Sequence, residues 1–150
     1  MILYKLTDRN DRTHGGCQWG EGITHKTNGE GELCGPGWIH AYCDPLLAVL
    51  LNPIHANFNP TTMHLWEGDG EVGKSDFGLK EGCTRFTTSK RIPIPEVSLE
   101  QKVRFGILAT MQVYNEPAWV KWAEGWLDGT DRSEAAPRAA AEASWAAAAE

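Results

Sequence analysis

The chain lacks any apolar run that approaches the roughly 18 residues needed to cross a bilayer. It also lacks an excess of basic residues, because 14 Lys and Arg stand against 20 Asp and Glu. Its first residues enter an alternating pattern without the basic segment and apolar core of an export signal. We therefore expect a cytoplasmic protein that contacts neither membrane nor nucleic acid directly, since nonspecific nucleic-acid binding needs concentrated Lys and Arg. The net charge of -6 suits a basic partner.

Cysteine is scarce, and the paired ligands of a structural zinc site are missing. The nearest approach to such a pair is His40-x2-Cys43, whose side chains point to opposite faces of a strand. Cys43 precedes an expected helix start, where the helix dipole favours a thiolate, but a packing role is the commoner one for cysteine. We expect no metal or other cofactor, and free thiols at all four cysteines: Cys17, Cys34, Cys43 and Cys83.

The first part of the chain reads as β-rich. Residues 1 to about 95 are rich in Gly, Thr and aromatic residues, and turn signals interrupt their short apolar stretches. Asp44 and Pro45 supply the cap and first position of a helix that we expect to end at Asn52-Pro53. The expected strands cover residues 2–7, 18–25, 38–42, 63–72 and 84–94.

A helical pattern begins at Ser98. Ser98-Leu99-Glu100-Gln101 is a capping box, and apolar residues recur at three- and four-residue steps to about residue 115. Pro117 starts a second helix with Trp119, Trp122 and Trp126 along one side, a stripe that we interpret as core. The prediction is one α+β domain over 1–128: a twisted, mostly antiparallel sheet (1–95) packed against two C-terminal helices (98–127). An Ala-rich tail, 129–150, is expected to be helical or loosely ordered.

An ordered set of motifs resembles a family of small uncharacterised phage and prophage proteins. The set comprises Tyr4-Lys5-x-Thr7, Gly16-x-Gln18-Trp19, Leu33-Cys34, Gly37-Trp38-x-His40-Ala41 and Asp44-Pro45-Leu46. The resemblance covers about residues 3 to 127, and many members continue into an Ala-rich tail. It implies a phage accessory protein that acts inside the infected bacterium, and it assigns no catalytic residue.

A second likeness concerns topology. Three motifs are similar to the scaffold of ADP-ribosyltransferases, which cleave NAD. They are Leu3-Tyr4-x-x-Thr7, a Gly-aromatic-x-His strand that enters a helix, and Gly70-Glu71-Val72. That family uses a His or Arg on its first strand and a Glu on a late strand. Here the first strand carries Lys5, and the candidate carboxylates are Glu67, Glu71 and Glu96.

Two groups of residues are candidate sites. Alternation along one strand places the first group on a common face, where it serves either an NAD-type ligand or the sheet's own packing: Trp38, His40 and Tyr42. The second group lies in a turn-rich acidic stretch and is a candidate partner-binding surface: Trp66, Glu67, Asp69, Glu71 and Asp76.

The expected function is binding rather than catalysis. The phage resemblance and the acidic balance together predict an accessory protein that inhibits a host protein, for instance a nucleic-acid-binding defence complex of the CRISPR type. The alternative is an ADP-ribosyltransferase-like enzyme or NAD binder. A homodimer through the Ala-rich tail is a further expectation.

Overall fold

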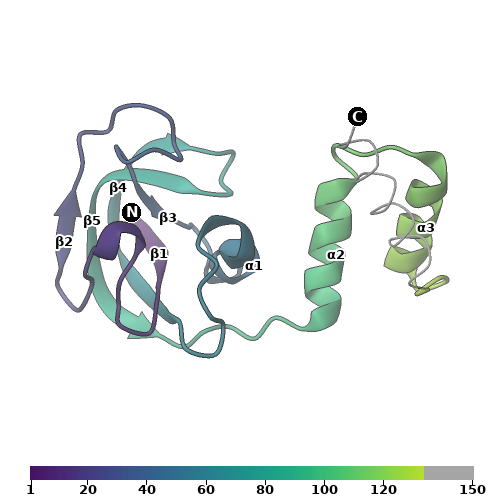
Figure 1. The fold of residues 1–150 in the computed structure, drawn as a ribbon, viewed down its shortest axis with the longest axis horizontal. Helices are drawn as coiled ribbons and strands as arrows, with labels where there is room; N and C mark the ends of the chain where they lie inside the picture. The colour runs from purple at the N-terminus through teal and green to yellow at the C-terminus, as the bar shows by residue number, and fades with distance from the viewer. Residues whose placement is uncertain (134–150) are drawn as a thin grey trace. The chain divides into compact units, whose positions relative to one another are not determined.

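The structure is a computed structural model that describes residues 1–133. The chain divides into two compact units, the first spanning Met1–Val97 and the second beginning at Ser98. The first contains the five-stranded antiparallel sheet and helix α1 (Pro45–His55), and the second contains helices α2 (Leu99–Thr110) and α3 (Pro117–Asp128) (Figure 1). The α+β class is confirmed, and the packing of sheet on C-terminal helices stays a prediction.

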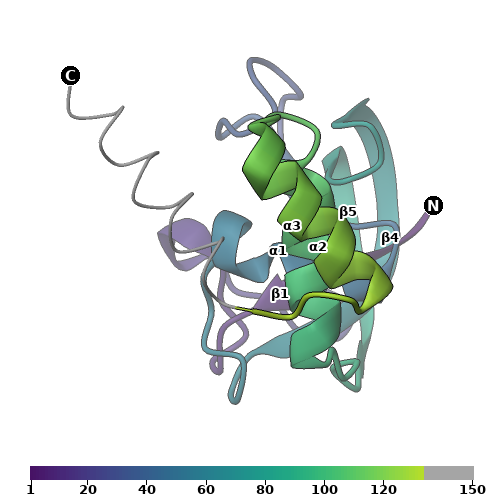
Figure 2. The same cartoon turned by 90° about the vertical axis from the view of Figure 1, so that its right-hand side faces the viewer.

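The sheet is organised around one long bent hairpin formed by β4 (His64–Ser75) and β5 (Glu81–Ile92) (Figures 1 and 2). Strand β1 (Ile2–Thr7) pairs with β4, while β2 (Thr24–Lys26) and β3 (Ile39–Ala41) pair with successive parts of β5. Backbone hydrogen bonds of 2.8 Å in both directions between Tyr4 and Tyr42 then join β3 back to β1. The sheet therefore curls into a ring, β1–β4–β5–β3.

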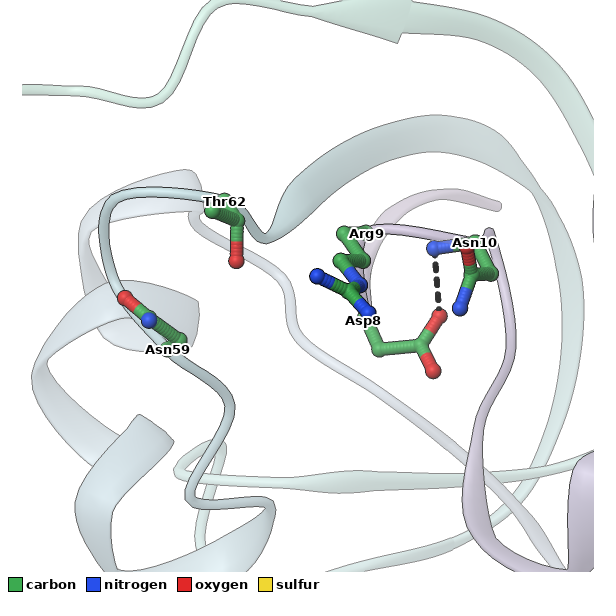
Figure 3. A pocket seen from close by; sticks show the side chains of 5 residues that line it. All are labelled: Asp8, Arg9, Asn10, Asn59 and Thr62. Atoms are coloured by element: carbon green, nitrogen blue, oxygen red, sulfur yellow. Dashed lines mark hydrogen bonds between the residues drawn. The ribbon is translucent and has the colours of Figure 1, made fainter.

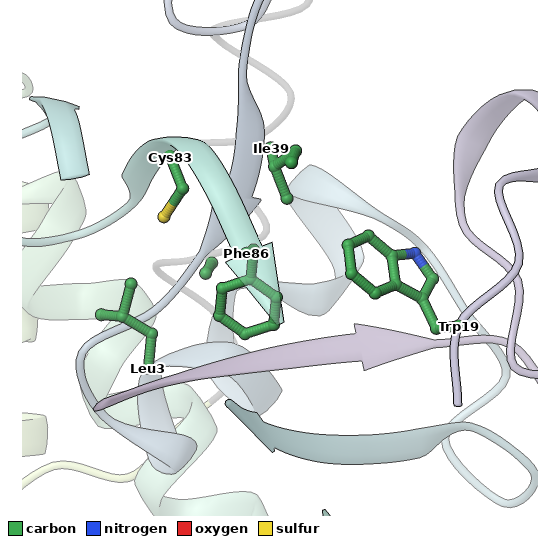
Figure 4. Packing of buried hydrophobic residues seen from close by; sticks show 6 residues of the cluster. Leu3, Trp19, Ile39, Cys83 and Phe86 are labelled. Carbon is green, nitrogen blue, oxygen red and sulfur yellow. The ribbon is translucent and has the colours of Figure 1, made fainter. Parts of the chain in front are cut away.

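The ring encloses the core of the first unit. Strand alternation turns buried side chains of β1, β3 and β5 inward, and Trp19 from the loop before β2 covers them (Figure 4). Glycine allows the strands to approach, because a Cβ on Gly70 would lie 2.7 Å from Leu3 Cδ1 and 2.9 Å from Cys83 Sγ. The core residues are Leu3, Trp19, Ile39, Ala41, Cys83 and Phe86.

Several boundaries differ from the sequence prediction. The strand expected over 18–25 is only Thr24–Lys26, because the Gln18 side chain donates to backbone carbonyls of Asn10, Asp11 and Trp19 and fixes a loop there. The β4 and β5 strands reach further toward each other than 63–72 and 84–94. The helix expected to end at Asn52-Pro53 continues to His55.

Pro53 is tolerated in α1 because the last turn is held from outside the helix. The Asn52 side chain accepts from the Phe58 amide at 3.0 Å and donates to the Phe58 carbonyl at 2.9 Å. The Asn52 carbonyl accepts from the Ala56 amide at 3.0 Å. At the other end, Asp44 caps the helix by accepting from the Leu46 amide at 2.7 Å, as predicted.

The second unit is a helical hairpin. The capping box of α2 is present, since Ser98 and Gln101 exchange side-chain to backbone bonds of 2.8 and 3.1 Å. Helix α2 ends at Thr110 in a turn rather than near residue 115, and α3 ends at Asp128, where Gly129 caps it in the left-handed conformation. The tryptophan stripe is core, as predicted; the buried residues are Ile107, Trp119, Trp122, Ala123 and Trp126.

Residues 130–133 fold back on this hairpin. The Asp131 amide donates to the Gly125 carbonyl at 3.0 Å, and Trp122 Nε1 donates to the Ser133 carbonyl at 2.9 Å. Arg132 stacks on the Trp126 ring and pairs with Glu100. The remainder of the predicted tail, and the homodimer expected through it, lie outside the described residues.

Candidate functional site

The tip of the β4–β5 hairpin, residues 75–80, presents an aromatic side chain to solvent. Phe77 is 99% exposed, and Leu79, two residues later, is 43% exposed. The backbone of Phe77 has φ 48°, a left-handed conformation that bulky side chains rarely adopt. The fold of the first unit therefore gains no packing from Phe77 and carries a local conformational cost at that residue.

Hydrogen bonds hold this tip in place. Ser75 Oγ accepts from the Gly78 amide at 3.1 Å and donates to Glu81 Oε1 at 3.0 Å, and Glu81 is buried. The Asp76 amide donates to the Lys80 carbonyl at 2.9 Å. The tip is therefore an ordered platform rather than a loose loop, which lowers the entropy cost of using Phe77 as an anchor.

The tip also contacts the start of α1. Cys43 Sγ donates to the Gly78 carbonyl at 3.4 Å, immediately before the Asp44 cap. Asp76 belongs to the acidic candidate surface predicted from the sequence. Burial is the main cause that lowers the pKa of His55 at the end of α1, and the charge of Asp76 acts in the opposite direction. The tip thus joins an apolar anchor to one predicted acidic residue.

The other members of the acidic candidate surface lie along β4. Glu67, Asp69 and Glu71 alternate on one face of the strand, where each carboxylate pairs with a cation. Glu67 pairs with Lys90, Glu71 pairs with Arg85, and Asp69 pairs with both Arg85 and the terminal amine of Met1, at 2.8 to 3.1 Å. These contacts make the face a ladder of mixed charge, not an unpaired acidic patch.

Trp66 is separated from this ladder. Its neighbours on the strand alternate away from it, and its ring is buried. Trp66 Nε1 donates to Asp11 Oδ1 at 3.0 Å, and the Arg91 guanidinium lies 5.3 Å from the ring centroid. Trp66 therefore belongs to a network around Asp11 that the sequence pattern did not reveal.

Asp11 accepts from side chains of β4 and β5. His64 Nδ1 lies 2.8 Å from Asp11 Oδ1, and the Arg91 guanidinium lies 2.6 Å from Oδ2. Burial raises the pKa of the Asp11 carboxyl, but the bonds from His64 and Trp66 and the charge of Arg91 outweigh it, so the pKa falls below its ordinary value. Asp11 also has φ 58°, a conformation that Asp tolerates. The network joins the β1–β2 loop to β4 and β5.

A polar pocket adjoins this region (Figure 3). Its Asp8 carboxylate already accepts from the Asn10 and Arg12 amides, both at 2.8 Å, as an ordinary turn interaction. Arg9 supplies a cation there. The lining residues are Asp8, Arg9, Asn10, Asn59 and Thr62.

The ligand candidates Trp38, His40 and Tyr42 lie on and beside β3. Ile39 and Ala41, which alternate with them, face the core. Trp38 Nε1 donates to the Gly31 carbonyl at 3.1 Å, and His40 Nε2 bonds to the Leu33 carbonyl. Burial lowers the pKa of His40 despite this bond. Both rings therefore hold the 28–36 loop against the strand.

Tyr42 is buried against α1. Its hydroxyl lies 2.9 Å from His55 Nδ1, the two rings stack, and burial raises the pKa of Tyr42 to about 12. The three predicted ligand residues are thus engaged with two different segments of the chain, a loop and a helix.

The four cysteines are unpaired thiols that differ in exposure. Cys34 and Cys43 are exposed, whereas Cys83 is buried in the core and burial raises its pKa to about 11. Cys34 Sγ accepts from Lys80 Nζ at 3.0 Å. Within residues 1–133, no group of three or more His, Cys, Asp or Glu side chains is placed to hold a metal ion.

Within the same described range, no helix combines the length and the apolar character that a membrane span requires.

The chain matches no protein-family model, no curated protein and no solved structure. The resemblance to the phage family therefore stays a prediction.

Proposed function

We propose that this protein acts by binding a host protein through the hairpin tip, as a phage accessory protein that inhibits its target. The observation that carries the proposal is Phe77, an aromatic side chain 99% exposed on a hydrogen-bonded turn. Aromatic residues that enter a partner's pocket dominate the energy of many interfaces. A strained, ordered backbone beneath such a residue is typical of functional positions.

The chemistry of the tip describes the partner. Phe77 and Leu79 require an apolar pocket, and Asp76 together with the net charge of -6 favours a basic rim. A nucleic-acid-binding surface of a host defence complex has such a rim, because it must attract phosphates. The protein then competes with nucleic acid for that surface of the host protein.

The test is retention of a host protein from bacterial lysate by the immobilised chain, followed by affinity measurement with the retained protein. Phe77→Ala is expected to weaken binding by roughly 30-fold or more, the effect of losing a hot-spot residue. Ile54→Ala is the matched control, because Ile54 is also apolar and 72% exposed but lies on α1. Failure to retain a host protein at ordinary salt, or equal weakening by both variants, contradicts the proposal. So does a retained protein that keeps its full activity.

The NAD-binding alternative has no comparable observation behind it. The Trp38 and His40 rings are engaged with backbone carbonyls of the 28–36 loop. An NAD ligand would have to displace that loop to reach them. Transfer from labelled NAD by the wild type, lost in His40→Ala, would favour the alternative.

A further inference from the structure

Cys34 and Lys80 form a close pair that neither the fold nor the proposed binding function explains. Lys80 is 4% exposed, yet its side chain ends on a sulfur rather than on a carboxylate, with Nζ 3.0 Å from Cys34 Sγ. Buried lysines usually pair with a carboxylate, because an unpaired buried charge is costly. The Lys80 side chain is therefore held at hydrogen-bonding distance from a thiol that solvent reaches.

The two members of the pair have complementary access. Cys34 lies in the 28–36 loop and is exposed, so a small oxidant reaches its sulfur, while Lys80 approaches the same sulfur from the protein side. The other exposed thiol, Cys43, contacts the Gly78 carbonyl instead of an amine. Cys34 thus has a nitrogen nucleophile within reach, and Cys43 provides an internal comparison.

We propose that Cys34 is a site of oxidation by hydroperoxides and that Lys80 captures the oxidised sulfur in a covalent sulfur–nitrogen cross-link. In the first step the sulfur attacks the peroxide, so an S–O bond forms, the O–O bond breaks, and water or an alcohol leaves. The thiol is oxidised by two electrons to a sulfenic acid, and the peroxide is reduced by two.

In the second step Lys80 Nζ attacks the sulfenic sulfur with its lone pair, which is free once the ammonium group has lost a proton. The S–N bond forms, the S–O bond breaks, and the hydroxyl group leaves as water with one proton from the nitrogen, without further oxidation. The product is a sulfenamide, two hydrogen atoms lighter than the starting pair. The 3.0 Å separation already places the reacting atoms at near-attack distance.

The cross-link would join two segments that are distant in sequence. Lys80 closes the hairpin tip, because its carbonyl accepts from the Asp76 amide at 2.9 Å. Attachment to Cys34 ties that tip to the 28–36 loop. A thiol reductant would reverse the bond, since a sulfenamide is open to attack at sulfur.

The test is peptide mass spectrometry of the full chain after treatment with hydrogen peroxide. Trypsin cleaves after Lys26, Lys74 and Arg85, so Cys34 falls in peptide 27–74 and Lys80 falls within 75–85. Trypsin does not cleave after a modified lysine, so we expect 27–74 joined to an intact 75–85. A disulfide to Cys83 would instead leave Lys80 free and attach only residues 81–85, which separates the two products.

Three variants complete the design. Cys34→Ser and Lys80→Arg are expected to abolish the joined peptide, and Cys43→Ser is expected to retain it. In Lys80→Arg, the sulfenic acid at Cys34 should accumulate and be trapped by dimedone roughly tenfold more than in the wild type, because its intramolecular partner is gone. The inference is overturned if the wild type gives cleavage after Lys80 together with sulfenic or sulfinic Cys34. It is equally overturned if the joined peptide persists in Cys34→Ser.

Discussion

Lys5 Nζ donates to the carbonyl of His40 at 2.7 Å inside the ring formed by β1, β4, β5 and β3. The Lys5 side chain is buried, and its ammonium lies 4.9 Å from the Trp19 ring centroid. Burial lowers the pKa of Lys5 to about 8, although nearby Cys17 and Cys83 act in the opposite direction. The ring therefore contains a charge that the fold tolerates at a cost.

Replacing Lys5 by Met should make stability less dependent on alkaline pH. Between the folded pKa of about 8 and the ordinary lysine pKa of 10.5, the unfolded wild type binds more protons than the folded one. Its free energy of unfolding therefore gains from this residue as pH rises through that window, by up to about 3 kcal/mol. Lys5→Met lacks this gain, so the free energy of unfolding of the variant should fall relative to that of the wild type between pH 7 and pH 10.5. Urea unfolding of the wild type and the variant across this pH range measures the two free energies of unfolding. A difference between them that stays constant with pH would refute the prediction.

Asp11→Asn should weaken the first unit and remove an acid-dependent part of its stability. The folded pKa of Asp11 lies below its ordinary value, so the carboxylate contributes stability above pH 3.8 that is lost as pH falls through the folded pKa. Asn keeps the shape and tolerates φ 58°, but it loses the ionic contact with Arg91. We expect a loss of about 1 to 3 kcal/mol at pH 7. The variant's loss should diminish below pH 4 in denaturant titrations; an equal loss at both pH values would contradict this assignment.

Gly70→Ala tests the tight curl of the sheet. The new methyl group would meet Leu3, Cys83 and Phe86 at 2.7 to 3.1 Å, so overpacking should cost about 1 to 3 kcal/mol. Gly106→Ala is the control, because nothing lies within 4 Å of a Cβ at that position of α2. There alanine should stabilise the helix by up to about 1 kcal/mol. Thermal unfolding monitored by circular dichroism distinguishes the two, and a neutral Gly70→Ala would show that the ring is looser than described.

Phe77→Asn should separate stability from binding. Asn accepts the left-handed backbone better than Phe, so the free energy of unfolding should rise by about 1 kcal/mol. Binding to the host partner should fall as in Phe77→Ala, because the anchor is absent. Denaturant unfolding and calorimetric titration measure the two effects on one sample. A variant that is less stable than the wild type would mean that Phe77 supports the fold.

Local chemistry in the sequence predicted the helix starts well. Asp44-Pro45 and Ser98 with Gln101 satisfy amides within a few residues of themselves, so their roles depend little on the rest of the fold. The end of α1 was missed because Asn52 reaches Phe58 from inside the helix and supports the turn containing Pro53. That support comes from backbone atoms of Phe58, beyond the helix, which a proline rule does not consider.

The candidate site was harder to predict, because it depends on pairings between distant residues. The acidic pattern on β4 was visible, but its cations come from β5 through a register that contains bulges. The predicted strands end at residue 72 and begin again at residue 84, so the sequence assigns no role to Phe77, whereas β4 and β5 extend to either side of the tip. A turn signal at Ser75-Asp76 with Gly78 was the available clue.

The pairing of β1 with β4 has a consequence for biosynthesis. Ile2 pairs with Asp69 and Thr7 with His64, so β1 cannot pair with β4 until the ribosome has released residues 64–69. At about 5 to 20 residues per second, the growing chain spends several seconds with that segment unpaired. Contacts this remote along the chain also slow the search for the native topology. The nascent polypeptide thus passes through an interval in which chaperones and proteases have their best access to it.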